Sequence, residues 1–298
     1  MLKYSAMMLF IIIYSSCKTK NHTTDHVVTT VNSDSLTEFS TIYLKPVKTR
    51  LYSASVNDSF SIFQSIPSDY NKDSAKKYPL IILLDANIYF EPMLSQAKLL
   101  TGIGNIEECI VTGIGYKDLP SMDSVRSRDY TFPKAIPEYE MALSGGADRF
   151  KYFIDKEFLP KIENDYKIDT QKIILCGHSL GGYFVLYYLL KSAGEKKFSI
   201  TNFVSASPSL HYNHRFIFQM EDSISLMEKL LPAKLYISMG SRDMGDKESK
   251  GILNAFAQQL NNHHYTGMQV QSDEYSNFGH LDAALPGFSK GLTFVFSK

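Results

Sequence analysis

The stretch KIILCGHSLGGYFVLYYLL, residues 172–190, decides the fold of this chain. Lys172 is followed by the apolar residues 173–175, which include two isoleucines, and residues 183–190 are apolar without a helix breaker. This pattern predicts a buried strand, a sharp turn and a buried helix. Residues 177–181 fit the G-x-S-x-G turn, where glycines avoid collisions and the central serine is exposed. We therefore predict that Ser179 is a nucleophile beside the helix N–H groups; a glycine-rich turn with a buried serine is the alternative.

Strand-like and helix-like segments alternate along the rest of the chain. Residues 49–54 and 60–66 alternate in polarity and flank a turn at 57–58, which predicts an antiparallel hairpin. Residues 116–146 show no clear periodicity, and a loop of that length in a compact domain is usually functional. Further strands are predicted at 79–85, 109–114, 172–175, 200–205, 233–239 and 268–272, and helices near 91–102, 147–166, 183–190, 214–230, 247–261 and after His280. This alternation predicts an α/β fold with a mostly parallel sheet and helices on both faces.

The composition is that of an ordinary globular protein. The 298 residues include 31 Lys and Arg and 31 Asp and Glu, so the formal net charge is zero. A nucleic-acid-binding protein would show a basic excess, so we expect no such partner. The sequence has no Walker, Rossmann or zinc-spacing motif, and no metal or cofactor is implied. Cys109 and Cys176 fall in predicted buried strands, where we expect them to act as small hydrophobic residues that are not bonded to each other.

The first 17 residues have the features of an export signal. Lys3 precedes the apolar run 7–13, and two small residues stand before Cys17. The run is too short to span a bilayer core of about 30 Å. The segment resembles a bacterial lipoprotein signal, which implies that Cys17 is lipidated, although Tyr14 departs from that pattern. A plain secretory signal and an uncleaved anchor are the alternatives, and each places the protein outside the cytoplasm.

Residues 18–40 are polar and predict a disordered tether, so the folded domain is expected to span 41–298. With a lipidated Cys17, this organisation predicts a periplasmic or cell-surface lipoprotein attached to a bacterial membrane.

A serine nucleophile needs a base, and the base needs an acid that holds its tautomer. When the serine comes first along the chain, the acid second and the histidine third, the acid and the histidine each follow one of the later strands of the sheet. His280 follows the last predicted strand directly before the final helix, where the base is expected. The loop after the preceding strand supplies Asp243 as the acid, with Asp246 as the alternative. The oxyanion would be held by the N–H of Leu180 and by that of Ala86 or Asn87, in a loop that Asp85 is expected to order.

Several blocks together resemble the esterase branch of the α/β-hydrolases that includes siderophore esterases, S-formylglutathione hydrolase, feruloyl and acetylxylan esterases and mycolyltransferases. The blocks are YPLIILLD (78–85), GIGY (113–116), RDYT (128–131), GGADRF (145–150), the elbow, SASPSL (205–210) and the segment from His280 to 292. The likeness covers about residues 48–298. The resemblance implies an α/β-hydrolase fold and the roles already given to Ser179, His280 and Asp243.

The block around Arg128 and the compact size are most similar to the siderophore esterases. We expect substrate contacts from Arg128 and Tyr130 and from His211 and Tyr212. Arg126 and Arg128 could contact an anionic substrate, or form an ion pair with a carboxylate such as that of Asp129. The family often has Gly at the position of Ala86 and Trp after Ser-Pro-Ser, where this chain has His211 and Tyr212.

The expected function is therefore that of a serine carboxylic ester hydrolase acting on a small-molecule ester, in the first place a siderophore tri-lactone. The alternatives are an esterase that removes acyl groups from carbohydrate, an acyltransferase and a non-catalytic binding protein on the same fold. The sequence does not indicate an oligomeric state.

Overall fold

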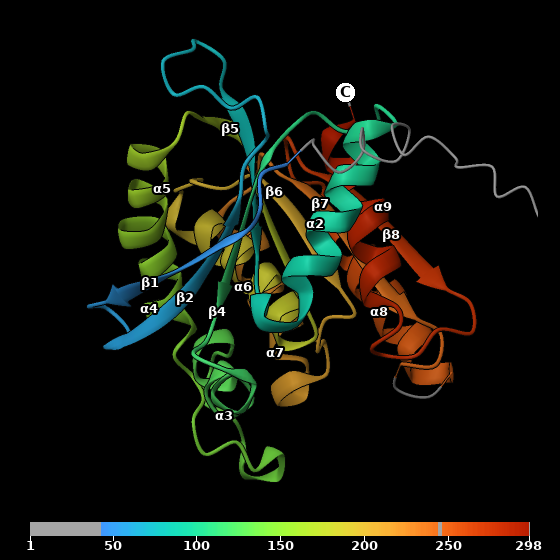
Figure 1. Ribbon diagram of the computed structural model, residues 1–298. Coiled ribbons are helices and arrows are strands. Elements are labelled where there is room, and N and C mark those ends of the chain that lie inside the picture. Colours follow the sequence, from blue (N-terminus) through green and yellow to red (C-terminus); the bar gives the residue numbers. More distant parts are fainter. Residues whose placement is uncertain (1–42, 244–245, 298) are drawn as a thin grey trace, which may run out of the picture. The chain divides into compact units, whose positions relative to one another are not determined.

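The computed structural model describes residues 43–243 and 246–297, which belong to one compact unit of the chain (Figure 1). The expected export signal, Cys17 and the tether to residue 40 lie outside these residues. Within the described part of the chain, none of the helices combines the length and the apolar character that crossing a membrane requires.

One eight-stranded sheet forms the centre of this unit, in the order β1-β2-β4-β3-β5-β6-β7-β8. The strands are β1 (Val47–Ser53), β2 (Asp58–Ser65), β3 (Tyr78–Leu83), β4 (Ile110–Gly115), β5 (Ile168–His178), β6 (Asn202–Ala206), β7 (Lys234–Gly240) and β8 (Gln269–Tyr275). β1 pairs with β2 and β2 with β4 in antiparallel fashion, and the remaining pairs are parallel. β3 and β4 are buried at every position, as expected for strands covered on both faces.

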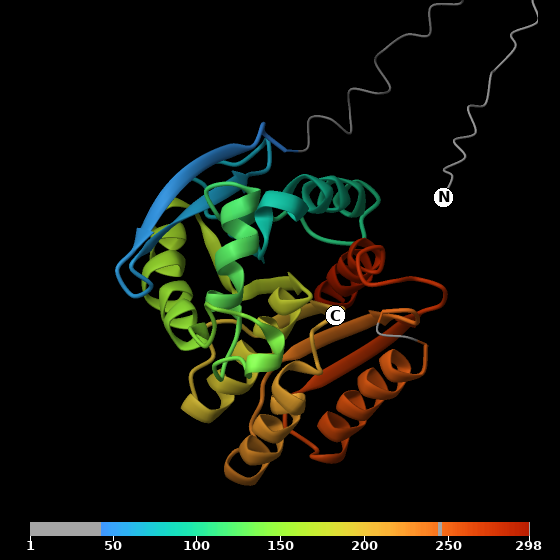
Figure 2. The ribbon, with the colours of Figure 1, turned by 90° about the horizontal axis from the view of Figure 1, so that it is seen from below.

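Helices cover both faces of the sheet. They are α2 (Ala86–Gly102), α3 (Leu119–Tyr130), α4 (Ala147–Phe153), α5 (Leu159–Asp165), α6 (Leu180–Glu195), α7 (Tyr212–Met227), α8 (Asp246–Asn262) and α9 (Ala284–Phe296), with a 3₁₀ turn η1 (Pro137–Tyr139) and a π turn η2 (Ile154–Phe158). α2 and α9 lie side by side on one face (Figures 1 and 2), and α4, α6 and α7 pack on the other. Each face has its own apolar cluster, so the predicted mostly parallel α/β fold is confirmed.

Two elements differ from the prediction. The segment 116–146 contains helix α3, whose sequence LPSMDSVRSRDY buries only Met122, Asp129 and Tyr130 and therefore shows no apolar period. Its start does have a sequence signal, because Asp118 accepts a hydrogen bond from the Ser121 N–H at 2.8 Å.

The helix expected over 147–166 consists of α4, the π turn η2 and α5. Pro160 stands at the start of α5 and has no N–H to donate to the preceding turn, which accounts for the irregularity. Elsewhere the predicted elements are present with boundaries shifted by a few residues. Cys109 and Cys176 are buried free thiols, as predicted.

The packing of α9 on the sheet depends on Gly291, where a Cβ would clash with the side chain of Val204 in β6. We predict that Gly291→Ala lowers the free energy of unfolding by about 1–3 kcal/mol, because a buried branched side chain must move. Gly251 in α8 is the matched control, since a Cβ there meets no atom within 4 Å. Gly251→Ala should raise the free energy of unfolding by about 0.5–1 kcal/mol in the same denaturant titration. Equal effects of the two substitutions would contradict this account.

Candidate active site

The predicted turn between β5 and α6 is present, and its conformation explains its glycines. Ser179 has φ 60° and ψ −123°, a region that side-chain-bearing residues rarely occupy. A Cβ on Gly177 would collide with the main chain of Gly181, so only glycine permits the close approach. The Ser179 N–H donates to the Ala206 carbonyl at 3.1 Å, which fixes the turn to β6.

Three neighbouring parallel strands are each followed by a residue with positive φ. Asp85 follows β3 with φ 52°, Ser179 follows β5 with φ 60°, and Ser207 follows β6 with φ 42°. β3 and β5 are adjacent, so α2 and α6 both begin at this edge of the sheet and direct their N-terminal N–H groups toward it. Such strained residues cluster at functional sites, and here one of them is the serine itself.

The predicted base and acid are in contact. His280 Nδ1 lies 2.6 Å from Asp243 Oδ1, and the Asp243 side chain is 4% exposed. A carboxylate can only accept, so Nδ1 carries the proton and Nε2 is free to act as a base. The two loops are joined by the Arg242 N–H, which donates to the Phe278 carbonyl at 2.9 Å. The side chain of Asp246, the alternative acid, lies outside the described residues.

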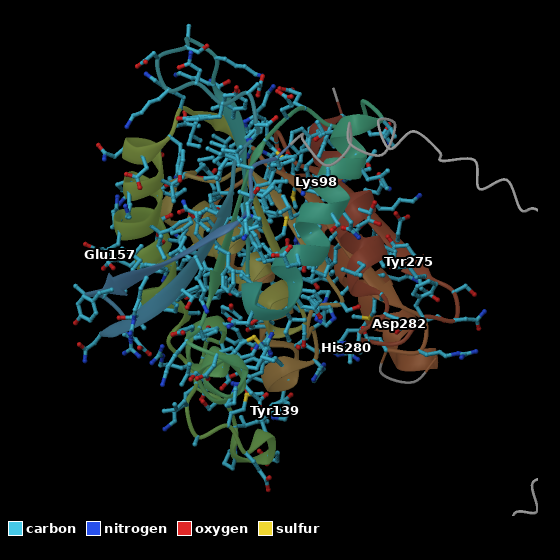
Figure 3. The ribbon with its side chains drawn as sticks, in the orientation of Figure 1. Lys98, Tyr139, Glu157, Tyr275, His280 and Asp282 are labelled. Carbon is cyan, nitrogen blue, oxygen red and sulfur yellow. The ribbon has the colours of Figure 1, made fainter. Side chains whose placement is uncertain are left out.

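Two cavities meet at Ser179 and His280. The larger, of about 450 Å³, is also lined by Asp243 and by Tyr139, His211 and Tyr212. Figure 3 shows Tyr139 and His280 at the same end of the sheet. The smaller cavity, of about 210 Å³, lies on the side of α2 and is lined by Ile88, Tyr89, Met122 and Leu281. The smaller cavity is also lined by Asp85, Asp123, Arg126 and His178, so Ser179 stands between two recesses that each combine apolar and charged side chains.

His211 and Tyr212 line the larger cavity as expected, and the structure adds Tyr139 and Met141 from the long loop. The rings of Tyr139 and Tyr212 stack with centroids 5.3 Å apart and an interplanar angle of 30°. The Tyr139 hydroxyl donates to the His211 carbonyl at 3.1 Å, so the loop is fastened to the start of α7. The sequence indicated only that residues 116–146 were functional, because a wall made by contacts between distant segments has no local pattern.

Arg126 lines both cavities beside Ser179. Its Nε and Nη2 donate to the two oxygens of Asp85 at 2.9 and 2.6 Å, and Nη2 also lies 3.4 Å from the His178 carbonyl. Burial would lower the pKa of the guanidinium, but the Asp85 carboxylate outweighs it and holds that pKa above its usual value. Asp85 thus orders the loop, as expected, and it neutralises the permanently charged guanidinium of Arg126 in the wall of the site.

Arg128 and Tyr130, for which substrate contacts are expected, do not line either of the two cavities that contain Ser179. Arg128 forms two hydrogen bonds with Asp129 at 2.8 and 3.0 Å and one with Asp58 at 2.9 Å. These contacts are the ion pairs that the sequence indicated as the alternative to substrate binding. Tyr130 is fully buried, and its hydroxyl accepts a hydrogen bond from the Asp85 N–H at 3.2 Å. On α3, Arg126 rather than Arg128 faces the serine.

Of the expected oxyanion donors, Leu180 lines the larger cavity as the first residue of α6. Ala86 is 2% exposed, and Asn87 uses its side chain to bind the main chain of Tyr116, accepting at 2.6 Å and donating at 3.0 Å. Neither side chain lines a cavity with Ser179, so any contribution of Ala86 or Asn87 must come from the main-chain N–H at the start of α2.

The residue before the nucleophile, His178, is 3% exposed. Its Nδ1 lies 3.0 Å from the Tyr89 hydroxyl, and its Nε2 lies 2.8 Å from the His280 carbonyl. Burial lowers the pKa of His178 to about 4, so the ring is neutral at physiological pH.

One cluster in the described part of the chain has the composition of a metal site: Glu221, Asp222 and His263. The buried Glu221 carboxylate already accepts hydrogen bonds from His263 at 2.7 Å, Tyr265 at 2.7 Å and Gln259 at 2.6 Å. A cation would have to displace these donors, so the contacts instead fasten α7 to the end of α8.

Comparisons with known proteins agree with this geometry. Residues 53–288 match the family described as "Putative esterase". The ferri-bacillibactin esterase BesA of Bacillus subtilis is 31% identical over 256 residues, which cover 80% of this chain and 85% of BesA. The apo-salmochelin esterase of Escherichia coli O6:H1 is 26% identical over 217 residues, 69% of this chain and 65% of that protein.

The crystal structure of the BES protein from Bacillus cereus superposes with a TM-score of 0.73 at 24% identity, covering 85% of this chain and 95% of that one. The predicted α/β-hydrolase fold is therefore confirmed. The chain belongs to the esterase family that its residues 53–288 match, and it is a carboxylic ester hydrolase.

The Asp85–Arg126 pair yields a stability prediction. Arg126→Met leaves a carboxylate that is 2% exposed without its charge partner, and we expect a loss of about 3–5 kcal/mol in the free energy of unfolding. Adding Asp85→Asn removes the uncompensated charge and should recover a substantial part of that loss. A double-mutant cycle by denaturant unfolding measures the coupling, and additive effects would show that the pair contributes nothing.

The buried His178 predicts a pH dependence. In the unfolded chain its pKa is near 6.5, and in the fold it is about 4. Between these values the unfolded state binds more protons, so the free energy of unfolding falls as the pH is lowered, by up to about 3 kcal/mol. His178→Gln should flatten this part of the stability–pH curve, measured by denaturant titration from pH 7 to 4. An unchanged slope would contradict the assignment.

Proposed function

We propose that this esterase cleaves its substrate through an acyl-enzyme on Ser179, with His280 as base and Asp243 as the acid that orients it. The observation that carries the proposal is the 2.6 Å contact between His280 Nδ1 and Asp243 Oδ1, in the cavity that also contains Ser179. This contact fixes the tautomer whose Nε2 can take a proton from the serine.

In the first half of the reaction Ser179 Oγ attacks the ester carbonyl carbon while its proton passes to His280 Nε2. The negative charge on the carbonyl oxygen is stabilised by the Leu180 N–H and the second N–H at the start of α2. The bond to the alkoxy oxygen then breaks, and the leaving alcohol takes the proton from His280. In the second half His280 removes a proton from water, the hydroxide attacks the acyl-enzyme, and the free acid leaves as Ser179 regains its proton.

We propose a siderophore ester as the substrate class. The similarity to two relatives, a ferri-bacillibactin esterase and an apo-salmochelin esterase, supports it. The chemistry of the larger cavity supports it as well. The partly exposed ring of Tyr139, backed by the buried Tyr212, offers a surface to an aromatic acyl group, and the Arg126–Asp85 ion pair lies in the wall of the same cavity.

We also propose that the enzyme is exported and attached to a membrane through lipidated Cys17, on a tether formed by residues 18–40. The support is the order of charge, apolar run, small residues and cysteine in the first 17 residues. Metabolic labelling with a fatty-acid analogue would test it, with Cys17→Ala as the control that should lose the label and the membrane association.

The substrate proposal predicts that the enzyme hydrolyses bacillibactin or salmochelin with a kcat/KM at least about 100-fold above that for acetylated xylo-oligosaccharides. One relative is named for an iron-loaded siderophore and the other for an iron-free one, so both the ferric and the iron-free forms should be tested. Chromatography of the products gives the rates. Faster release of acetate from the sugars would show that the siderophore proposal is wrong.

The catalytic roles predict a ranked loss of activity in the same assay. Ser179→Ala should lower kcat by at least about 10⁴-fold, because no nucleophile remains. Asp243→Asn should lower kcat by about 10²–10⁴-fold, because the His280 tautomer is no longer held. Asp246→Asn is the matched control for the acid. A larger loss for Asp246→Asn than for Asp243→Asn would transfer the role to Asp246.

A further inference from the structure

The residue before the nucleophile makes contacts that the catalytic roles above do not use. His178 joins α2, through Tyr89, to the loop that carries His280, and the two contacts span 89 and 102 residues of sequence. The imidazole rings of His178 and His280 also pack against each other, with centroids 4.6 Å apart.

The hydrogen bonds define one direction of donation. The His280 carbonyl can only accept, so His178 Nε2 must carry the proton and donate. In the neutral ring Nδ1 is then an acceptor, and the Tyr89 hydroxyl must donate to it. The Tyr89 hydroxyl therefore donates to His178 Nδ1, and His178 Nε2 donates to the His280 carbonyl. Both hydrogen bonds require the same tautomer of the His178 ring.

The His280 loop needs such a support. None of residues 276–282 is buried, so side-chain packing does little to hold this segment. Asp243 holds the ring of His280 by one nitrogen, but a ring can still move with its own main chain. The bond from His178 holds the main chain, and His178 is covalently adjacent to the nucleophile in the rigid turn.

Tyr89 is itself firmly placed. It is 8% exposed, and its ring packs edge-on against Phe288 of α9, with centroids 5.6 Å apart. The helix that follows His280 and the helix that carries Tyr89 are thus packed together, and the hydroxyl approaches His178 from a fixed direction.

We propose that His178, oriented by Tyr89, is a positioning residue that sets the distance between the base His280 and the nucleophile Ser179. It does so by holding the His280 carbonyl from a residue adjacent to the serine. The inference rests on the catalytic roles proposed for Ser179 and His280.

The test compares His178→Leu, His178→Gln and Tyr89→Phe with the parent enzyme. The probes are hydrolysis of p-nitrophenyl acetate and the rate of labelling by a fluorophosphonate. Leucine offers no donor, whereas the glutamine amide can donate to the His280 carbonyl in place of Nε2. Tyr89→Phe keeps the ring and removes only the hydroxyl. Tyr265→Phe is the matched control, because it also removes a buried hydrogen bond but lies away from both cavities.

His178→Leu should lower kcat and the labelling rate about 100-fold, because a base misplaced by about 1 Å loses that much. His178→Gln should regain at least about tenfold of that loss, and Tyr89→Phe should lose about three- to tenfold, with KM within about twofold throughout. Tyr265→Phe should lower the melting temperature and leave kcat unchanged.

A folded His178→Leu enzyme with the parent kcat would overturn the inference, and so would equal losses for His178→Leu and His178→Gln. If His178→Leu does not fold, Tyr89→Phe decides: the parent kcat in that variant would overturn the inference. Ser179→Ala in the same assays separates the two proposals. If Ser179→Ala is inactive and the His178 and Tyr89 variants are fully active, only the positioning role fails; if Ser179→Ala stays active, the catalytic assignment itself fails.

Discussion

The close contact of main chain with main chain between Gly177 and Gly181 is the constraint on which the rest of the site depends. It permits Ser179 to take φ 60°, a conformation that costs of the order of 1–3 kcal/mol and that the surrounding structure must maintain. Bonds from Ser179 to β6 and from the Ser209 N–H to the Ser179 carbonyl provide that support. The exposed hydroxyl is therefore a product of the sheet and the helix together.

The parallel sheet brings the remaining groups to the same edge. β3, β5 and β6 are neighbours, and each is followed by a residue with positive φ; because β3 and β5 are adjacent, α2 and α6 begin beside one another. The N-terminal N–H groups of the two helices bring partial positive charge to one point, and the Arg126–Asp85 ion pair lies beside it. Such an arrangement favours attack on an ester, because the carbonyl oxygen becomes an anion during the reaction.

One wall of the larger cavity is built from η1, the residues that follow it and the start of α7. The loop that carries Tyr139 and Met141 is fastened to the start of α7, where Asn213, His214 and Arg215 all have positive φ. Asn213 also donates to the Lys134 carbonyl at 2.8 Å and accepts from the Ile136 N–H at 3.2 Å. This unusual left-handed turn is thus held by the loop whose tyrosine stacks over the cavity.

The sequence by itself determined the α/β fold, the turn at Ser179 and the candidates His280 and Asp243. Apolar periodicity and glycine positions are local properties of the chain, and the order of strands and catalytic residues can be followed along it. It did not distinguish Arg126 from Arg128, since both lie on a polar helix and only the packing of α3 decides which faces the serine. It was silent on Tyr139, Met141 and the chain from Tyr89 through His178 to His280. Those contacts join residues up to 102 positions apart, and only the tertiary structure brings them together.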